Sequence, residues 1–236
     1  MPGKFDKIKS GTNRHIKMNN SPPESEPELL DRAEQISGKT LQYVANLLNL
    51  DLPANMALNK GLAGELLETY LGATAGNLPE PDFQHIGVEL KTIPVNHLGM
   101  PRESTYVCIV SMLPENNKCW EQSLVKRKLS RVLWLPVEAE PGIPLSMRRI
   151  GTAILWSPDA EQEQILRQDW EELMDLVLMG QLEQITASYG QYLQIRPKAQ
   201  DGKSLQTGIG ADGGLIQTLP RGFYLRTEFT RKILSR

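Results

Sequence analysis

The stretch PDFQHIGVELKT, residues 81–92, places two carboxylates and an amine in a segment whose apolar residues predict a buried strand. Alternate side chains of a strand share a face, so Glu89 and Lys91 project to one side, opposite to the buried residues Val88, Leu90 and Ile93. A buried or half-buried charge needs a partner. Glu89 and Lys91 therefore form either an ion pair on an exposed sheet face or part of a functional site.

Asp82 favours the functional site. It follows a proline-rich turn and begins the segment that leads into the strand, so the carboxylates of Asp82 and Glu89 can converge at the strand end. Carboxylate oxygens with open positions suit Mg²⁺ or Mn²⁺. A lysine beside them can stabilise the charge that develops on a phosphate. This spacing is typical of nucleases that hydrolyse phosphodiesters, although so short a pattern is also common by chance.

A third carboxylate precedes this stretch. The segment GELLETYLG, residues 64–72, belongs to a predicted helix over 62–71 that ends at Gly72, with Glu68 at the margin of its apolar stripe. Glu68 is either a solvated helix acid or a residue that reaches into the metal site from the helix.

The order of the predicted elements indicates a mixed α/β domain. Helix patterns come first, at 28–37, after Thr40 and at 62–71. Strand patterns follow at 87–94, 104–113 and 132–137, and a long helix opens after Ser157 and Pro158. Two more strands are expected at 191–196 and 222–226.

Composition limits the possible functions. The chain has 236 residues, of which 40% are hydrophobic and 23% charged, which is ordinary for a soluble globular protein. It has no apolar run of the roughly 20 residues that a membrane-spanning helix needs. Its two cysteines have no metal-binding spacing and suit a reducing cytoplasm. A net charge of −2 excludes a bulk nucleic-acid binder, so a protein acting on DNA must concentrate its positive charge locally.

Positive charge is concentrated in two places. Residues 1–17 carry five lysines and arginines against one aspartate, and we expect residues 1–20 to form a disordered basic tail before a folded region at 21–236. A second cluster at 126–131 precedes a strand and is either a solvated face or a set of phosphate contacts.

The sequence GIGADG at 208–213 matches a dinucleotide-binding pattern but predicts a mobile loop, and the acids of 161–175 predict a solvated helix face.

Five blocks give a more specific signal: GELLETYLGATAGNLPEPDFQHIGVELKTIPV, KRKLSRVLWLPVE, LWSPDAEQEQILRQDWEELMD, YLQIRPKA and LPRGFYL. In this order they closely resemble the MutH family of methyl-directed DNA mismatch repair endonucleases, from about residue 21 onward. The resemblance implies a restriction-endonuclease-like fold, with a mixed central sheet flanked by helices and two arms around a DNA cleft.

The resemblance also implies a function. Members of the family nick the unmethylated strand at hemimethylated GATC sites in double-stranded DNA, and MutL activates them after MutS finds a mismatch. We accordingly expect a cytoplasmic, monomeric enzyme. Two alternatives stay open: a GATC restriction endonuclease that cuts both strands, and a repair scaffold without catalytic activity.

Site residues follow from the same resemblance. Asp82 and Glu89 are expected to hold Mg²⁺, with Mn²⁺ as a substitute, while Lys91 is the catalytic lysine and Glu68 supports the metal site. Tyr224 is the candidate sensor of adenine methylation, because an N6-methyl group adds bulk where a tyrosine packs against the base. The expected DNA-binding residues are Lys60, Lys128, Arg196, Lys198 and Tyr224.

Overall fold

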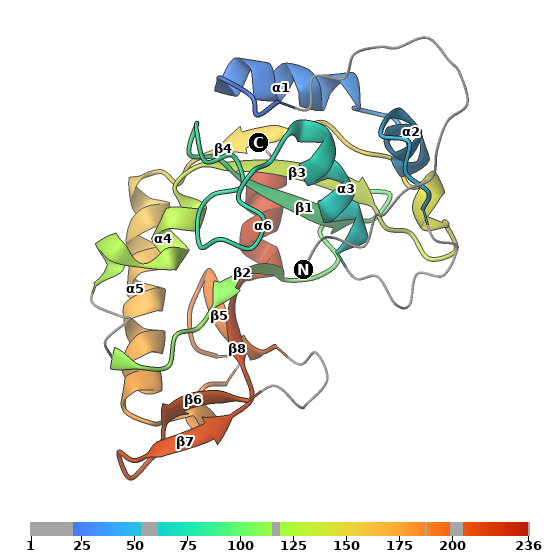
Figure 1. The fold of residues 1–236 in the computed structure, drawn as a ribbon. Helices are drawn as coiled ribbons and strands as arrows, with labels where there is room; N and C mark the ends of the chain where they lie inside the picture. Colours follow the sequence, from blue (N-terminus) through green and yellow to red (C-terminus); the bar gives the residue numbers. More distant parts are fainter. Residues whose placement is uncertain (1–20, 53–60, 115–118, 187, 199–204, 236) are drawn as a thin grey trace.

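The computed structural model describes residues 21–52, 61–114, 119–186, 188–198 and 205–235. These residues form two lobes (Figure 1). The large lobe contains a sheet of order β1–β3–β4. β1 (Glu89–Val95) pairs in parallel with β3 (Val132–Glu138), and β3 pairs antiparallel with β4 (Ile154–Trp156). Because β3 is the central strand, its VLWLPVE sequence is apolar on both faces.

Each face of this sheet has its own hydrophobic core. One face packs against α1 (Glu26–Gln35), α2 (Leu41–Leu47) and α3 (Leu62–Leu71), and it receives Val88 and Leu90. The opposite face packs against α5 (Ala160–Leu178) and α6 (Thr227–Leu234), and it receives Ile93 and Val95. Ile93 therefore lies on the face of Glu89 and Lys91, so its predicted placement with Val88 and Leu90 is wrong.

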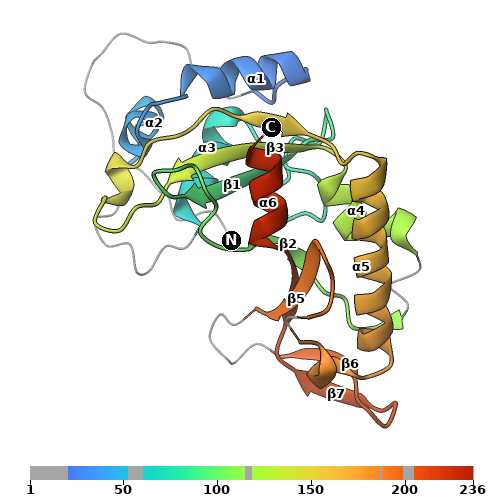
Figure 2. The same cartoon turned by 180° about the vertical axis from the view of Figure 1, so that it is seen from behind.

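The small lobe is built from two antiparallel sheets. The first has the order β2–β8–β5, formed by β2 (Thr105–Ile109), β8 (Arg221–Leu225) and β5 (Leu193–Pro197). The second is a hairpin of β6 (Gln206–Ile209) and β7 (Leu215–Thr218). Figure 2 shows α5 running along one side of the molecule, from the large lobe to this hairpin. The long helix thus spans both lobes.

The termini of α5 follow from local chemistry. Asp159 caps the helix, because its side chain accepts a hydrogen bond from the Gln162 backbone N–H while the Gln162 side chain returns one to Asp159. The helix ends at Leu178, just before Gly180, which has φ +70° and lies so close to Gly210 that a side chain would clash with it.

Most predicted elements are present, with small shifts of their ends. The strand predicted at 104–113 is shorter, and a short helix α4 (Leu124–Leu129), which carries most of the basic cluster, was not predicted. The predicted loop at 208–213 is wrong in part, because Gly208 and Ile209 lie in β6 and residues 210–214 form the hairpin turn. The remaining elements are the short 3₁₀ helices η3 (Trp120–Gln122), η4 (Leu145–Met147) and η5 (Leu182–Gln184).

None of the helices in the described part of the chain is long and apolar enough to span a membrane. The predicted basic tail at 1–20 lies outside the described residues, as does Lys60.

Candidate active site

The start of β1 brings Asp82 and Glu89 together. An isolated bridge between Phe83 and Val88 folds the intervening residues into a tight turn, in which Gly87 has φ +66°. Asp82 returns beside the strand, where its Oδ2 accepts a hydrogen bond of 2.8 Å from the Leu90 backbone N–H. Asp82 is 9% exposed and Glu89 is 1% exposed, so two carboxylates are buried side by side at the strand end.

The carboxyl groups perturb one another. Burial raises the pKa of Asp82, and the nearby Glu89 carboxylate raises it further. Burial also raises the pKa of Glu68 to about 7, with additional repulsion from Asp82 and Glu89. Glu68 lies on α3, near enough to this group for its charge to be repelled by theirs. Three acids of this kind, mutually repelling and partly desolvated, favour a cation among them.

Two lysines supply positive charge at Glu89. Lys91 Nζ lies 2.5 Å from Glu89 Oε1, and Lys128 Nζ lies 2.9 Å from Glu89 Oε2. Burial by itself lowers the pKa of Lys91, but the Glu89 carboxylate outweighs this effect and the net shift is upward. Lys91 is therefore a protonated cation, which suits it to neutralise phosphate charge and not to accept a proton.

The donor chemistry of the site fits a divalent metal ion. Carboxylate oxygens from Asp82, Glu89 and Glu68 are the hard ligands that such ions prefer. Among the described residues, however, no three acids, histidines or cysteines converge closely enough to form a complete metal site. Each oxygen of Glu89 accepts a hydrogen bond from an ammonium group, and each keeps a further lone pair for a metal ion.

The raised pKa of Glu68 gives a testable dependence of stability on pH. The unfolded chain loses this proton near pH 4.5 and the folded chain near pH 7, so folded protein binds more protons between these values and its stability falls as the pH rises through them. We expect Glu68→Gln to raise the melting temperature at pH 8.5 in EDTA, with about 2–4 °C for each kcal/mol gained, and to change it little at pH 5. Thermal unfolding at both pH values measures the difference.

Glu65→Gln is the matched control, because Glu65 is exposed one turn earlier on the same helix. An equal effect of Glu68→Gln at the two pH values would contradict the assignment.

The other members of the basic cluster are paired within the protein. Lys126 binds Glu163, Arg127 binds Glu80 and Arg131 binds Glu26. Lys128 alone of the four binds a carboxylate of the acidic group. The structure therefore divides a cluster for which the sequence left two interpretations open, a solvated face or a set of phosphate contacts.

The predicted DNA-reading residues lie together on the small lobe. Arg196 and Lys198 come from β5 and the residue after it, and Tyr224 lies on the neighbouring β8. The Arg196 guanidinium donates to Ser104 Oγ at 2.6 Å and lies 5.8 Å from the centre of the Tyr224 ring. Phe223 and Leu225, on either side of Tyr224, are buried.

Tyr106 was missed by the sequence reasoning, which weighted charged residues. Its hydroxyl accepts a hydrogen bond of 2.8 Å from Lys198 Nζ, and its ring packs edge-on to that of Tyr224 at 5.4 Å between centroids. Gly222 makes room for both rings, since a Cβ there would lie 2.9 Å from Tyr106 Cε2. Burial raises the pKa of Tyr106 to about 12, and the positive charge of nearby Lys91 opposes this shift.

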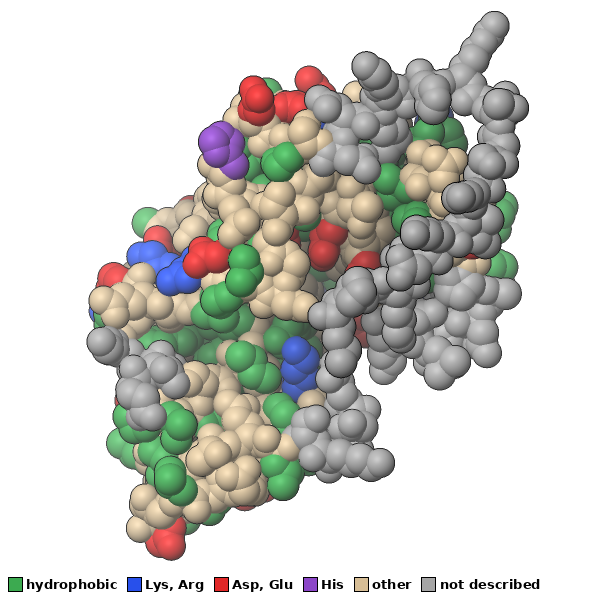
Figure 3. Space-filling model, in the orientation of Figure 1, with side chains coloured by type: hydrophobic (Ala, Val, Ile, Leu, Met, Phe, Trp, Pro, Cys, Tyr) green, Lys and Arg blue, Asp and Glu red, His purple; other side chains and the backbone are tan. Residues whose placement is uncertain are grey.

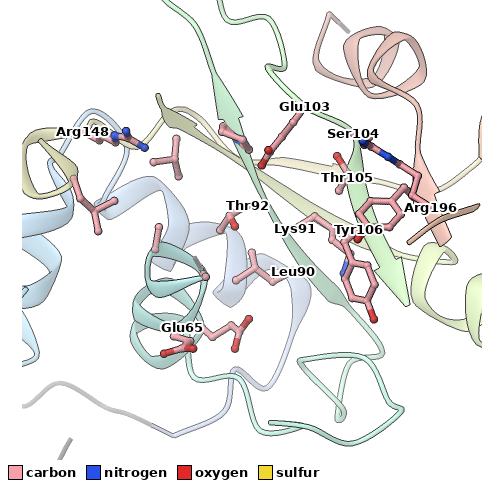
Figure 4. Close-up of a pocket in the computed structure, with 18 of the residues that line it drawn as sticks. Glu65, Leu90, Lys91, Thr92, Glu103, Ser104, Thr105, Tyr106, Arg148 and Arg196 are labelled. Carbon is pink, nitrogen blue, oxygen red and sulfur yellow. The ribbon is translucent and has the colours of Figure 1, made fainter. Parts of the chain in front are cut away.

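A cleft of about 1070 Å³ joins the two groups of residues. Glu68 and Lys91 line it from the large lobe, and Arg196 and Tyr224 line it from the small lobe. Asp82 and Glu89 are buried beside it. Figure 3 shows the surface hollowed between the lobes, with acidic side chains above the hollow, and Figure 4 shows Lys91 and Tyr106 side by side.

Hydrolysis of a phosphodiester is the chemistry that these acids and lysines support, and the cleft between the lobes is where the substrate is expected to lie. A mixed sheet flanked by helices, with acids and lysines at one strand end beside the cleft, fits the class of restriction-endonuclease-like nucleases.

Comparisons with known proteins identify the family within this class. The family described as DNA mismatch repair enzyme MutH matches residues 71–169. DNA mismatch repair protein MutH from Escherichia coli K12 is 54% identical over 216 residues, which cover 92% of this chain and 94% of that protein. The protein of the same name from E. coli O6:K15:H31 strain 536 is 55% identical over the same shares. The chain belongs to the MutH family of DNA mismatch repair endonucleases.

Proposed function

We propose that this endonuclease uses Mg²⁺ to nick the unmethylated strand of DNA at hemimethylated GATC sites. Mn²⁺ is a plausible substitute, because both ions prefer carboxylate oxygens. The observation that carries the proposal is the group of Asp82, Glu89 and Lys91 at the start of β1, next to the cleft. In this proposal residues 21–236 act as one endonuclease domain whose two arms, the lobes, enclose the duplex.

The site residues divide the chemistry among them. Asp82 and Glu89 would hold the Mg²⁺, with Glu68 beside them. When bound, the ion withdraws charge from the scissile phosphate and makes water more acidic. Lys91 keeps its proton, neutralises the charge that develops on the phosphate and orients the attacking water. Water attacks phosphorus in line with the leaving 3′ oxygen, so the products carry a 5′-phosphate and a 3′-hydroxyl.

Release of Glu89 is part of this proposal. Lys128 holds one oxygen of Glu89 and Lys91 holds the other. If Glu89 held the metal ion in place of its contact with Lys128, Lys128 would be available to bind a phosphate of the DNA, in line with the DNA-binding role that the resemblance implies. Arg196 and Lys198 contact the duplex from the small lobe.

Tyr224 senses methylation of the target adenine in this proposal. The tyrosine is half-buried at the cleft, and its edge-on contact with Tyr106 limits how far its ring can move away from a base. We expect Tyr224→Ser to lose most of the preference for unmethylated over fully methylated GATC, measured as the ratio of nicking rates on the two duplexes. Tyr224→Phe retains the ring and serves as the control that keeps the preference. Full discrimination by Tyr224→Ser would remove Tyr224 from this role.

The protein is proposed to act as a monomer in the cytoplasm, activated by MutL after MutS finds a mismatch. The relatives bear the name mismatch repair protein, which supports partners in that process. One active site per molecule suits a single cut, whereas cutting of both strands usually requires a symmetric dimer.

The decisive experiment is cleavage of a hemimethylated GATC duplex with Mg²⁺, in the presence and absence of MutL. We expect a nick confined to the unmethylated strand, a faster rate with MutL and no product in EDTA. A plasmid with GATC sites tests the alternatives, because a nickase accumulates open circles whereas a restriction enzyme yields linear DNA. A scaffold yields neither product.

A further inference from the structure

Few of the positive charges in the described part of the chain face the cleft. Its basic lining residues there are Lys91, Arg148 and Arg196. Lys91 is bound to Glu89, and Arg196 belongs to the reading residues of the small lobe. Arg148 remains as a cation on the wall of the large lobe that the proposed function has not used.

The backbone of Arg148 is firmly held. The residue directly follows η4, and its N–H donates to the Leu145 carbonyl at 3.1 Å. Its own carbonyl accepts from the Leu41 N–H at the start of α2, at 3.0 Å. These two bonds involve only the main chain of Arg148.

The guanidinium of Arg148 is weakly engaged. Its Nε lies 3.4 Å from the carbonyl of Ile143, which is a long hydrogen bond. Within the described ranges it forms no salt bridge, in contrast to Arg127 and Arg131. A half-buried guanidinium in a cleft with no carboxylate partner is suited to bind an anion that comes from outside the protein.

We propose that Arg148 binds a backbone phosphate of the DNA from the large lobe, across the cleft from the reading residues. Figure 4 shows Arg148 and Arg196 on opposite sides of β1, with Thr92 and Leu90 between them. A contact on each side of the catalytic strand fixes the position of the duplex over the site. Arg148 is thus a positioning residue that reads no base, since phosphate contacts carry no sequence information. This inference rests on the proposed function.

The test compares Arg148→Ala with Arg149→Ala. Both variants lose one positive charge, but Arg149 is exposed, donates to the Gly38 carbonyl at 2.9 Å and does not line the cleft. We measure the affinity of each variant for a hemimethylated GATC duplex over a range of salt concentrations in Ca²⁺, followed by single-turnover nicking in Mg²⁺. Thermal unfolding reports whether each variant is folded, and Arg148→Gln replaces Arg148→Ala if the alanine variant is not.

We expect Arg148→Ala to weaken binding about 10-fold and to reduce the slope of log affinity against log salt by about one. The preference for the unmethylated strand should stay that of the wild type, because a phosphate contact carries no sequence information. Arg149→Ala should leave the slope unchanged. Equal slopes for the wild type and Arg148→Ala would overturn the inference, and so would equal losses of affinity in the two variants. In either case, nicking of the duplex by the wild-type protein would leave the proposed function intact. A wild-type protein that neither binds nor nicks the duplex would overturn both.

Discussion

Asp82→Asn should lower the nicking rate by about 10³-fold or more while leaving affinity for the duplex nearly unchanged. The amide oxygen of asparagine can still accept the hydrogen bond from the Leu90 N–H, so the turn at the start of β1 is preserved. The substitution removes the negative charge, and with it one of the two carboxylates that would hold the metal ion. Single-turnover nicking at saturating enzyme, with Mg²⁺, measures the loss.

Stability separates this catalytic effect from unfolding. Burial and the neighbouring Glu89 raise the pKa of Asp82, so the folded protein holds its charged form at a cost at neutral pH. A neutral asparagine relieves this cost, and the melting temperature of Asp82→Asn at pH 8 should be no lower than that of the wild type. Glu65 is an exposed acid on the cleft wall, and the control variant Glu65→Gln should nick DNA at the wild-type rate. Wild-type nicking by Asp82→Asn would refute the site.

Asp169→Ala should destabilise the folded protein by about 3–5 kcal/mol. The Asp169 carboxylate, although it lies on α5 among exposed acids, is buried and accepts three backbone hydrogen bonds. Its Oδ1 binds the N–H of Gln191 at 2.7 Å, and its Oδ2 binds those of Tyr192 at 2.6 Å and Leu193 at 2.8 Å. Alanine leaves these donors without a partner where β5 begins.

Urea denaturation measures the effect of Asp169→Ala, with Asp175→Ala as its control. Asp175 is an exposed acid on the same helix, and its replacement should change the free energy of unfolding by no more than about 0.5 kcal/mol. A loss below about 1 kcal/mol for Asp169→Ala would show that the three N–H groups find other partners, such as water.

Local patterns were sufficient for the main strand of the site. The alternation of apolar and charged side chains along residues 88–93 indicated β1. It also placed Glu89 and Lys91 on one face of the strand, where they form an ion pair. The position of Asp82 next to Glu89 followed from a turn of a few residues. The helix that carries Glu68 was equally clear, because apolar spacing and a terminal glycine define it.

Contacts between distant residues were not predictable in the same way. Lys128 is 39 residues from Glu89, and nothing in the basic cluster distinguished it from its ion-paired neighbours. The acids of 161–175 were predicted to be solvated, and this is wrong for Asp169, because its partners follow 22–24 residues later. The β6–β7 hairpin was misread because its glycines, which permit a tight turn, also suggest an irregular loop.

The two ion pairs of Glu89, with Lys91 and Lys128, affect how the enzyme first binds its substrate. A pocket of bare carboxylates would repel the polyanionic duplex from the surface where it must settle. Two ammonium groups, delivered by β1 and α4, shield the most deeply buried of these acids. The resting protein thus presents the DNA with a site in which two ammonium groups offset most of the negative charge of the acids.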